Sequence, residues 1–222
     1  MKVSQRKINM IEKEITYTYI ENGSPAVCFM FSGAGYTYDK PLFYYSTMTM
    51  LQNGFDVVHI HYSYEHDMLR HPMMDITKVM VQDCTLVIDE VCQNKDYQET
   101  MFLGKSLGTI PIINGFMKNE RYIHAKMILL TPLLKFDSIF EGIMSSNHIT
   151  HLVIGEKDTH FNRERIQRIN AKTSMSMSMS MSMSIVTDAN HSLDIEPFNA
   201  SGSIMALDSV MKGLAEFVKI KN

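Results

Sequence analysis

The chain has 222 residues, of which 45% are hydrophobic, enough for the core of a single α/β domain spanning residues 1–222. Its formal net charge of -3 at pH 7 provides no basic field that would gather nucleic acid, so we expect no nucleic-acid partner. The polar N-terminus is not followed by an apolar stretch typical of a signal peptide, and no later run is long enough to span a membrane. We therefore expect a cytoplasmic protein with no membrane partner.

The first half of the chain alternates strand and helix patterns. Residues 11–20 alternate apolar and polar side chains and predict an edge strand, whereas the wholly apolar run 26–31 predicts a strand that is covered on both faces. Residues 38–53 predict a helix, and residues 55–62 predict the next strand. An interrupted helical period over residues 75–91 predicts a second helix.

The second half continues this alternation. Predicted strands cover residues 101–103, 126–132, 150–155 and about 183–187, and predicted helices cover residues 106–117, 162–171 and 203–219. Repeated strand–helix units imply an α/β fold with a mostly parallel central β-sheet and helices on both faces.

Residues 174–184 alternate Ser and Met without exception, which is typical of a simple-sequence expansion. The period of two is compatible with a strand, so the tract can lead into the last predicted strand and form part of it. A methionine-rich binding surface is the less favoured alternative.

Residues 104–108 read Gly-Lys-Ser-Leu-Gly and lie between a predicted strand and a predicted helix. The Gly-x-Ser-x-Gly pattern allows a sharp turn, because small residues two places on either side of the serine let the strand and the helix approach closely. Ser106 then lies exposed at the tip of the turn. The same pattern occurs in many ordinary turns, so a catalytic interpretation needs support from the rest of the chain.

A serine hydroxyl becomes a nucleophile when a base lies within hydrogen-bond reach and an acid orients that base. Asp158 directly follows the predicted strand 150–155, and His191 follows the last predicted strand. Both residues then occupy loops at the carboxyl ends of strands, where open parallel sheets bind their ligands. Asp137, after the preceding strand, is an alternative acid, whereas Asp188 is too close to the histidine in sequence to be favoured.

Three motifs in this order resemble those of the α/β-hydrolase superfamily, and the resemblance covers the chain from Ala26 to the C-terminal helix. They are the serine turn at residues 104–108, the acid turn Gly-Glu-Lys-Asp at residues 155–158 and the histidine loop Ala-Asn-His-Ser-Leu at residues 189–193. The resemblance implies an α/β-hydrolase fold without a large cap domain. It also implies a triad in which Ser106 is the nucleophile, His191 the base and Asp158 the orienting acid.

The resemblance further implies an oxyanion hole made of two backbone N–H groups. One would belong to Leu107 and the other to Ala34 or Gly35, in the loop after the strand 26–31. Ser32 stands where the family usually has a histidine. Backbone donors tolerate that change, and the sequence leaves the choice between Ala34 and Gly35 open.

Several other polar and aromatic residues carry a weaker signal. The pairs His59/His61 and His148/His151 lack a third ligand at a recognisable spacing, so we expect no metal site and no organic cofactor. Lys105 is interpreted as an exposed residue of the serine turn without a catalytic role. For the tyrosines of the predicted site loops, loop packing is at least as well supported as substrate contact.

The sequence therefore predicts a serine hydrolase that acts on small soluble carboxylic esters through an acyl-enzyme intermediate. A thioesterase, a small-peptide hydrolase or a C–C bond hydrolase would use the same triad, and a non-catalytic binding protein on the same fold is the alternative from another class. Residues 133–147 have room for one short helix but not for a cap domain, which predicts an open site and short acyl groups. The loops 36–45 and 63–74 could still form a wall over the serine. The physiological substrate and the oligomeric state stay open.

Overall fold

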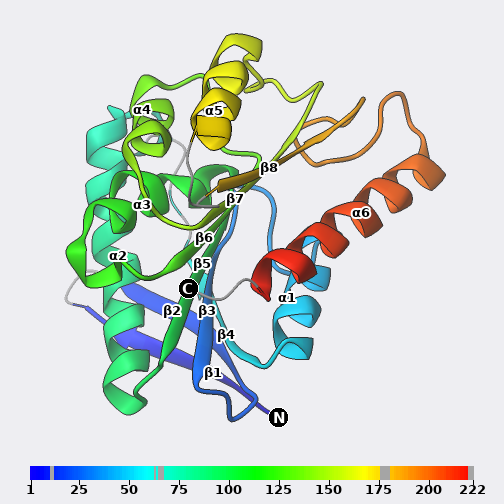
Figure 1. The fold of residues 1–222 in the computed structure, drawn as a ribbon. Helices are drawn as coiled ribbons and strands as arrows, with labels where there is room; N and C mark the ends of the chain where they lie inside the picture. The colour runs from blue at the N-terminus through cyan, green and yellow to red at the C-terminus, as the bar shows by residue number, and fades with distance from the viewer. Residues whose placement is uncertain (11–12, 63, 65–67, 176–180, 220–222) are drawn as a thin grey trace.

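The computed structural model describes residues 1–10, 13–62, 64, 68–175 and 181–219. An eight-stranded sheet in the order β1-β2-β4-β3-β5-β6-β7-β8 forms the centre of the molecule (Figure 1). Neighbouring strands from β4 through β3 to β8 pair in parallel, whereas β2 pairs antiparallel with both β1 and β4. The mostly parallel sheet predicted from the sequence is confirmed.

The strands are β1 (Lys2–Asn9), β2 (Glu14–Glu21), β3 (Ala26–Phe31), β4 (Phe55–His61), β5 (Glu99–Lys105), β6 (Lys126–Leu130), β7 (Thr150–Gly155) and β8 (Met181–Val186). The α-helices are α1 (Pro41–Gln52), α2 (Met73–Asn94), α3 (Thr109–Asn114), α4 (Asp137–Ser145), α5 (Arg163–Met175) and α6 (Ala200–Val218). Short 3-10 turns are η1 (Met68–Arg70), η2 (Ser106–Gly108), η3 (Phe116–Lys118) and η4 (Glu120–Tyr122).

Helices cover both faces of the sheet, as Figure 1 shows, with α1 and α6 on one face and α2 to α5 on the other. Alternate residues of β5 point to opposite cores: Phe102 packs against Phe116 at a ring distance of 5.0 Å under the larger helix layer, whereas Met101 and Leu103 lie under α1 and α6. β3 reads as a continuous apolar run because both of its faces are buried.

The N-terminal part differs from the sequence-based expectation. The polar segment β1 pairs along the whole of β2, with Val3 opposite Ile20, so β1 is the edge strand and β2 lies inside the sheet. The predicted strand began at residues 11–12, which lie outside the described residues. Charged side chains on β1 suit a sheet edge, because they discourage pairing with another chain.

Two further boundaries differ in the second half. The single helix expected over 106–117 is divided into η2, α3 and η3, and the last strand begins at Met181, earlier than expected. The middle of the Ser-Met tract, residues 176–180, lies outside the described residues. The short α4 is the helix within residues 133–147, and no helix among the described residues is long and apolar enough to cross a membrane.

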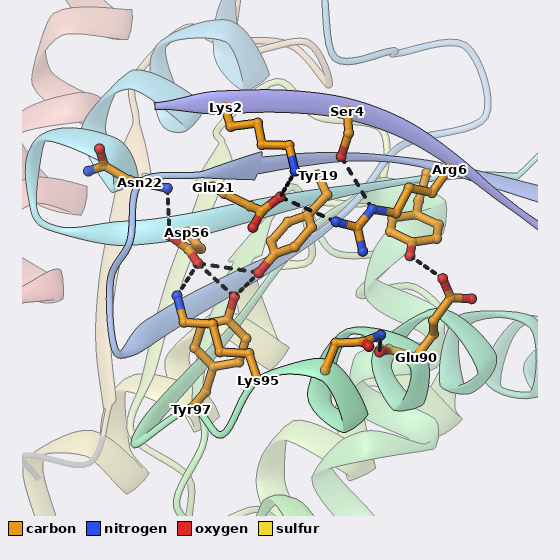
Figure 2. Close-up of polar contacts among 12 residues, drawn as sticks. Lys2, Ser4, Arg6, Tyr19, Glu21, Asn22, Asp56, Glu90, Lys95 and Tyr97 are labelled. Atoms are coloured by element: carbon orange, nitrogen blue, oxygen red, sulfur yellow. Dashed lines mark hydrogen bonds and ion pairs between the residues drawn. The ribbon is translucent and has the colours of Figure 1, made fainter.

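A buried carboxylate holds the turn between β2 and β3 through several polar contacts (Figure 2). Asp56, at the start of β4, has a side chain with no exposed surface and accepts hydrogen bonds of 2.7 Å from Lys95 Nζ and from the Tyr97 hydroxyl. The backbone N–H groups of Asn22 and Ser24 donate to its other oxygen at 2.7 and 3.2 Å. These contacts tie the β2–β3 turn to the segment between α2 and β5.

Candidate active site

The serine turn is shaped by close packing at its two glycines. A Cβ atom at Gly108 would lie 2.1 Å from the carbonyl oxygen of Phe31, and one at Gly104 would lie 2.5 Å from the carbonyl oxygen of Gly108. Ser106 has a φ of 52°, in the left-handed region that residues with side chains rarely adopt. The tight turn therefore forces Ser106 into a strained conformation at the carboxyl end of β5, as expected for a nucleophile elbow.

The structure brings Ser106, His191 and Asp158 into one hydrogen-bonded chain. Ser106 Oγ lies 2.8 Å from His191 Nε2, and His191 Nδ1 lies 2.8 Å from Asp158 Oδ2. The carboxylate is fully buried, whereas 31% of the His191 side chain is exposed. With the proton on Nδ1, the imidazole donates to the carboxylate and its Nε2 accepts from the serine hydroxyl.

The two other candidate acids lie elsewhere. Asp137 is the first residue of α4, is 87% exposed and forms an ion pair with Arg165. Asp188 is exposed and pairs with Lys157 at 2.7 Å. The structure thus places Asp158 at His191, while each alternative acid has a different partner.

The acid turn and the histidine loop are held together by the backbone. A Cβ at Gly155 would lie 2.2 Å from the carbonyl oxygen of Ala189, so the end of β7 touches the start of the histidine loop. Lys157 N–H donates to that same carbonyl at 2.8 Å, and Asn190 Oδ1 accepts from the backbone of Ser192 at 2.8 Å. These contacts fix both loops at the spacing that the Asp158–His191 hydrogen bond needs.

The loop after β3 lies against the nucleophile. A Cβ at Gly33 would be 3.5 Å from Ser106 Cβ, and the Gly33 N–H is occupied by the carbonyl of Tyr36 at 3.2 Å. Ala34 lines the same cleft as Ser106 and Leu107. The structure therefore places Ala34 in one cleft with Ser106 and Leu107, whereas Gly35 is not among the residues that line it.

Two tyrosines hold the backbone of Ser32, at the start of this loop. The Tyr62 hydroxyl donates to the carbonyl of Ser32 at 2.6 Å, and the Ser32 N–H donates to the Tyr38 hydroxyl at 3.1 Å. Tyr38 also stacks on His59 at a ring distance of 4.2 Å. For Tyr38 and Tyr62 the structure thus shows packing that supports the loop.

A cleft of about 500 Å³ opens beside Ser106. It is lined by Ala34, Leu69, His71, Pro72, Met73, Ile76, Ser106, Leu107, Ile110, Leu133, Phe136 and His160. Ile76, Ile110 and Leu133 form a buried apolar floor, whereas His71, Pro72 and Phe136 on the rim are exposed. The segment from η1 into α2 therefore lines one side of the cleft. It includes residues of the loop 63–74, which the sequence offered as a possible wall over the serine.

His160 is a site residue that the sequence-based reasoning missed. Its ring lies 5.4 Å from that of His191 and 6.0 Å from that of Phe136, and within the described part of the chain its buried Nδ1 has no hydrogen-bond partner. Burial lowers the pKa of His160, against the opposing effect of Asp158. In the sequence, its position two residues after Asp158 could have indicated that it lies near the candidate site.

Lys105 is buried, so the prediction of an exposed residue is wrong. It is 1% exposed, and its Nζ donates to the carbonyl of His191 at 3.0 Å and to Thr131 Oγ1 at 3.3 Å. Burial lowers its pKa to about 8, although Asp158 and Asp194 act in the opposite direction. Strand alternation could have revealed this, because Lys105 follows Met101 and Leu103 on one face of β5.

The histidine pairs lie away from this chain of residues and have protein partners. His59 lies 2.8 Å from Thr47 Oγ1, His61 lies 2.8 Å from Thr18 Oγ1, and His151 Nδ1 lies 2.8 Å from Ser182 Oγ. Among the residues that the structure describes, no cluster of three or more possible ligands could hold a metal ion.

The chain belongs to the α/β-hydrolase superfamily, since the model of an alpha/beta hydrolase domain matches residues 25–219. No curated protein gave a significant match to the sequence. Solved structures share the fold at low identity. The Pyrococcus furiosus esterase Pf2001 aligns with a TM-score of 0.73 at 14% identity, over 98% of this chain and 92% of that one. Est1E from Butyrivibrio proteoclasticus aligns with a TM-score of 0.69 at 14% identity, over 96% of each chain. Dienelactone hydrolase from Anabaena variabilis aligns with a TM-score of 0.68 at 16% identity, over 97% of this chain and 96% of that one.

Proposed function

We propose that the protein is a serine hydrolase of small carboxylic esters. The observation that carries this proposal is the continuous hydrogen-bonded chain from Ser106 through His191 to the buried Asp158, at the mouth of a cleft. The strained backbone of Ser106 supports it as well, because such strain is typical of catalytic positions and costs stability in a protein that only binds.

In the proposed reaction, Ser106 Oγ attacks the ester carbonyl carbon while its proton passes to His191 Nε2. The tetrahedral intermediate then collapses, the C–O bond to the alcohol breaks, and His191 returns the proton to the departing alcohol oxygen. A water molecule activated by His191 hydrolyses the acyl-enzyme in the same way. Asp158 stabilises the imidazolium in both halves, and no cofactor takes part.

The negative oxygen of the intermediate would be held by the backbone N–H groups of Leu107 and Ala34. Ala34 is preferred to Gly35 because it lines the cleft together with Ser106 and Leu107. Preorganised N–H donors of this kind stabilise the charge that develops in the transition state.

The cleft supports an uncharged acyl group of limited length. Its floor is apolar, so the first few carbons of an acyl chain would be buried, while further carbons would pass the exposed side chains of the rim and gain little from burial. The structural likeness to two esterases and a dienelactone hydrolase favours ester bonds over the thioester, peptide and C–C bonds that the same triad could cleave.

Hydrolysis of p-nitrophenyl acetate by the purified protein tests the proposal. The wild type should turn over, and Ser106→Ala should lose activity by about 1,000-fold or more with an unchanged Tm. Ser209→Ala, on the exposed face of α6, is the matched control and should retain full activity. Equal activity of Ser106→Ala and the wild type would contradict the assignment.

A further inference from the structure

Lys105 carries a charge that the proposed reaction does not use. It has almost no exposed surface, and its contacts are a hydroxyl, a carbonyl and an aromatic ring. In the part of the chain that the structure describes, no carboxylate forms an ion pair with it. Burying an unpaired ammonium group is costly, and an apolar side chain of similar length would fill the same space without that cost.

Two of the three contacts of Lys105 reach segments that hold the proposed catalytic groups, the histidine loop and the loop after β3. Its Nζ donates to the backbone carbonyl of His191 itself, at 3.0 Å, and to Thr131 at the end of the neighbouring β6. The same Nζ lies 4.4 Å from the ring centroid of Tyr36, a distance at which a cation is attracted to an aromatic face. Tyr36 closes the loop of Ala34, since its carbonyl accepts from Gly33.

From these contacts we infer that Lys105 is a positioning residue, whose ammonium group holds the His191 backbone and the Tyr36 loop on either side of the serine turn. This inference rests on the proposed serine hydrolase mechanism. Lys105 would act through His191 and the oxyanion loop and would not touch the substrate, because its side chain is buried and does not line the cleft.

The inference has a pH signature. Burial holds the pKa of Lys105 at about 8, so the ammonium group loses its proton near that pH. The neutral amine would bind the carbonyl more weakly and would lose its attraction to the ring of Tyr36. The ionisable groups facing it are Asp158 in the acid turn, His191 in the histidine loop, Asp194 directly after that loop, and Tyr36, whose own pKa is raised by burial.

The test compares kcat for p-nitrophenyl acetate in the wild type and in Lys105→Met between pH 7 and 10. The wild type should lose activity with an apparent pKa of about 8, as its ammonium group is lost. Lys105→Met should have a kcat lower by about tenfold to 100-fold at pH 7, since small misplacements of catalytic groups have effects of this size. Its KM should be nearly unchanged, and its profile should stay flat through pH 8.

Lys126→Met is the matched control, because Lys126 is also buried but lies at the other end of the adjacent strand, 2.6 Å from Glu99. It should keep the wild-type kcat and the wild-type profile. Thermal unfolding distinguishes a positioning role of Lys105 from a role in stabilising the fold. Lys105→Met should keep the wild-type Tm at pH 7 or exceed it, because the variant removes a buried charge that is costly to the folded state. The labelling rate of wild-type Ser106 by a fluorophosphonate gives the same pH profile without any variant.

The outcomes distinguish the two proposals. A wild-type activity that stays level through pH 8, or Lys105→Met with unchanged kcat, would overturn the role of Lys105 while the loss of activity in Ser106→Ala still supports the hydrolase. Full activity in Ser106→Ala would instead reject the hydrolase mechanism itself.

Discussion

The backbone N–H of His160 donates a 2.7 Å hydrogen bond to Oδ1 of Asp158, the carboxylate oxygen that His191 does not use. The carboxylate is thus held from both sides, with one oxygen fixed by the loop and the other facing the imidazole. A carboxylate fixed in this way can select the tautomer of His191 that accepts the serine proton.

Asp158→Asn should lower kcat by about 10,000-fold with the fold intact, because the amide cannot select that tautomer. Asp137→Asn is the matched control, since this exposed residue pairs with Arg165 on the protein surface. It should keep wild-type kcat. A larger loss of kcat in Asp137→Asn than in Asp158→Asn would show that the acid is wrongly assigned.

Gly108→Ala should destabilise the protein by at least about 2 kcal/mol and abolish activity, because the new methyl group would collide with the carbonyl of Phe31. Denaturant unfolding measures the loss. At Gly35 a methyl group would meet no atom within 4 Å, so Gly35→Ala should change the unfolding free energy by no more than about 0.5 kcal/mol. Equal stabilities of the two variants would contradict the packing described for the elbow.

These predictions depend on a site that the sequence largely reveals. Ser106, Asp158 and His191 were identifiable because each follows a predicted strand, and parallel strands bring their carboxyl ends to one edge of the sheet. Lys105 was misread as exposed because it stands beside the serine turn, although strand alternation places it on the same face of β5 as Met101 and Leu103. The structure was needed to show which groups its ammonium group contacts. The edge strand β1 was missed because two of its three half-buried positions, Ser4 and Arg6, carry polar side chains, so its sequence shows no alternation of apolar and polar residues.

Asp56→Asn should lower the unfolding free energy at pH 7 by about 2 to 4 kcal/mol, because it removes the charged partner of Lys95 from a buried network. Burial alone would raise the pKa of Asp56, but hydrogen bonds from Lys95, Tyr97 and two backbone N–H groups outweigh it and lower the pKa. The ionised Asp56 therefore stabilises the fold at pH values above its unfolded-state pKa, near 3.8. This stabilisation is lost as the pH falls through the lower pKa that Asp56 has in the folded state.

Urea unfolding at pH 7 and at pH 3 measures this effect. The difference between the wild type and Asp56→Asn should shrink at the lower pH, whereas Asp208→Asn, in an exposed pair with Lys212, should cost no more than about 0.5 kcal/mol at either pH. A difference that stays constant with pH would show that the ionisation of Asp56 does not contribute.

A series of p-nitrophenyl esters from acetate to palmitate tests the shape of the cleft. We expect kcat/KM to be greatest for acyl groups of about two to six carbons, because each further CH₂ would lie at the exposed rim and miss its burial energy of about 0.8 kcal/mol. A maximum at about ten carbons or more would instead mean that the wall formed by residues 69–76 encloses a long apolar groove.

Covalent labelling of Ser106 tests the central claim most directly. A fluorophosphonate reacts at a useful rate only with an activated serine, so mass spectrometry of the treated protein should find a single adduct, on Ser106. Asp158→Asn should slow the labelling, and Ser106→Ala should abolish it. An unmodified protein, or an adduct on a different serine, would contradict the assignment of Ser106 as the nucleophile and favour a binding protein on this fold.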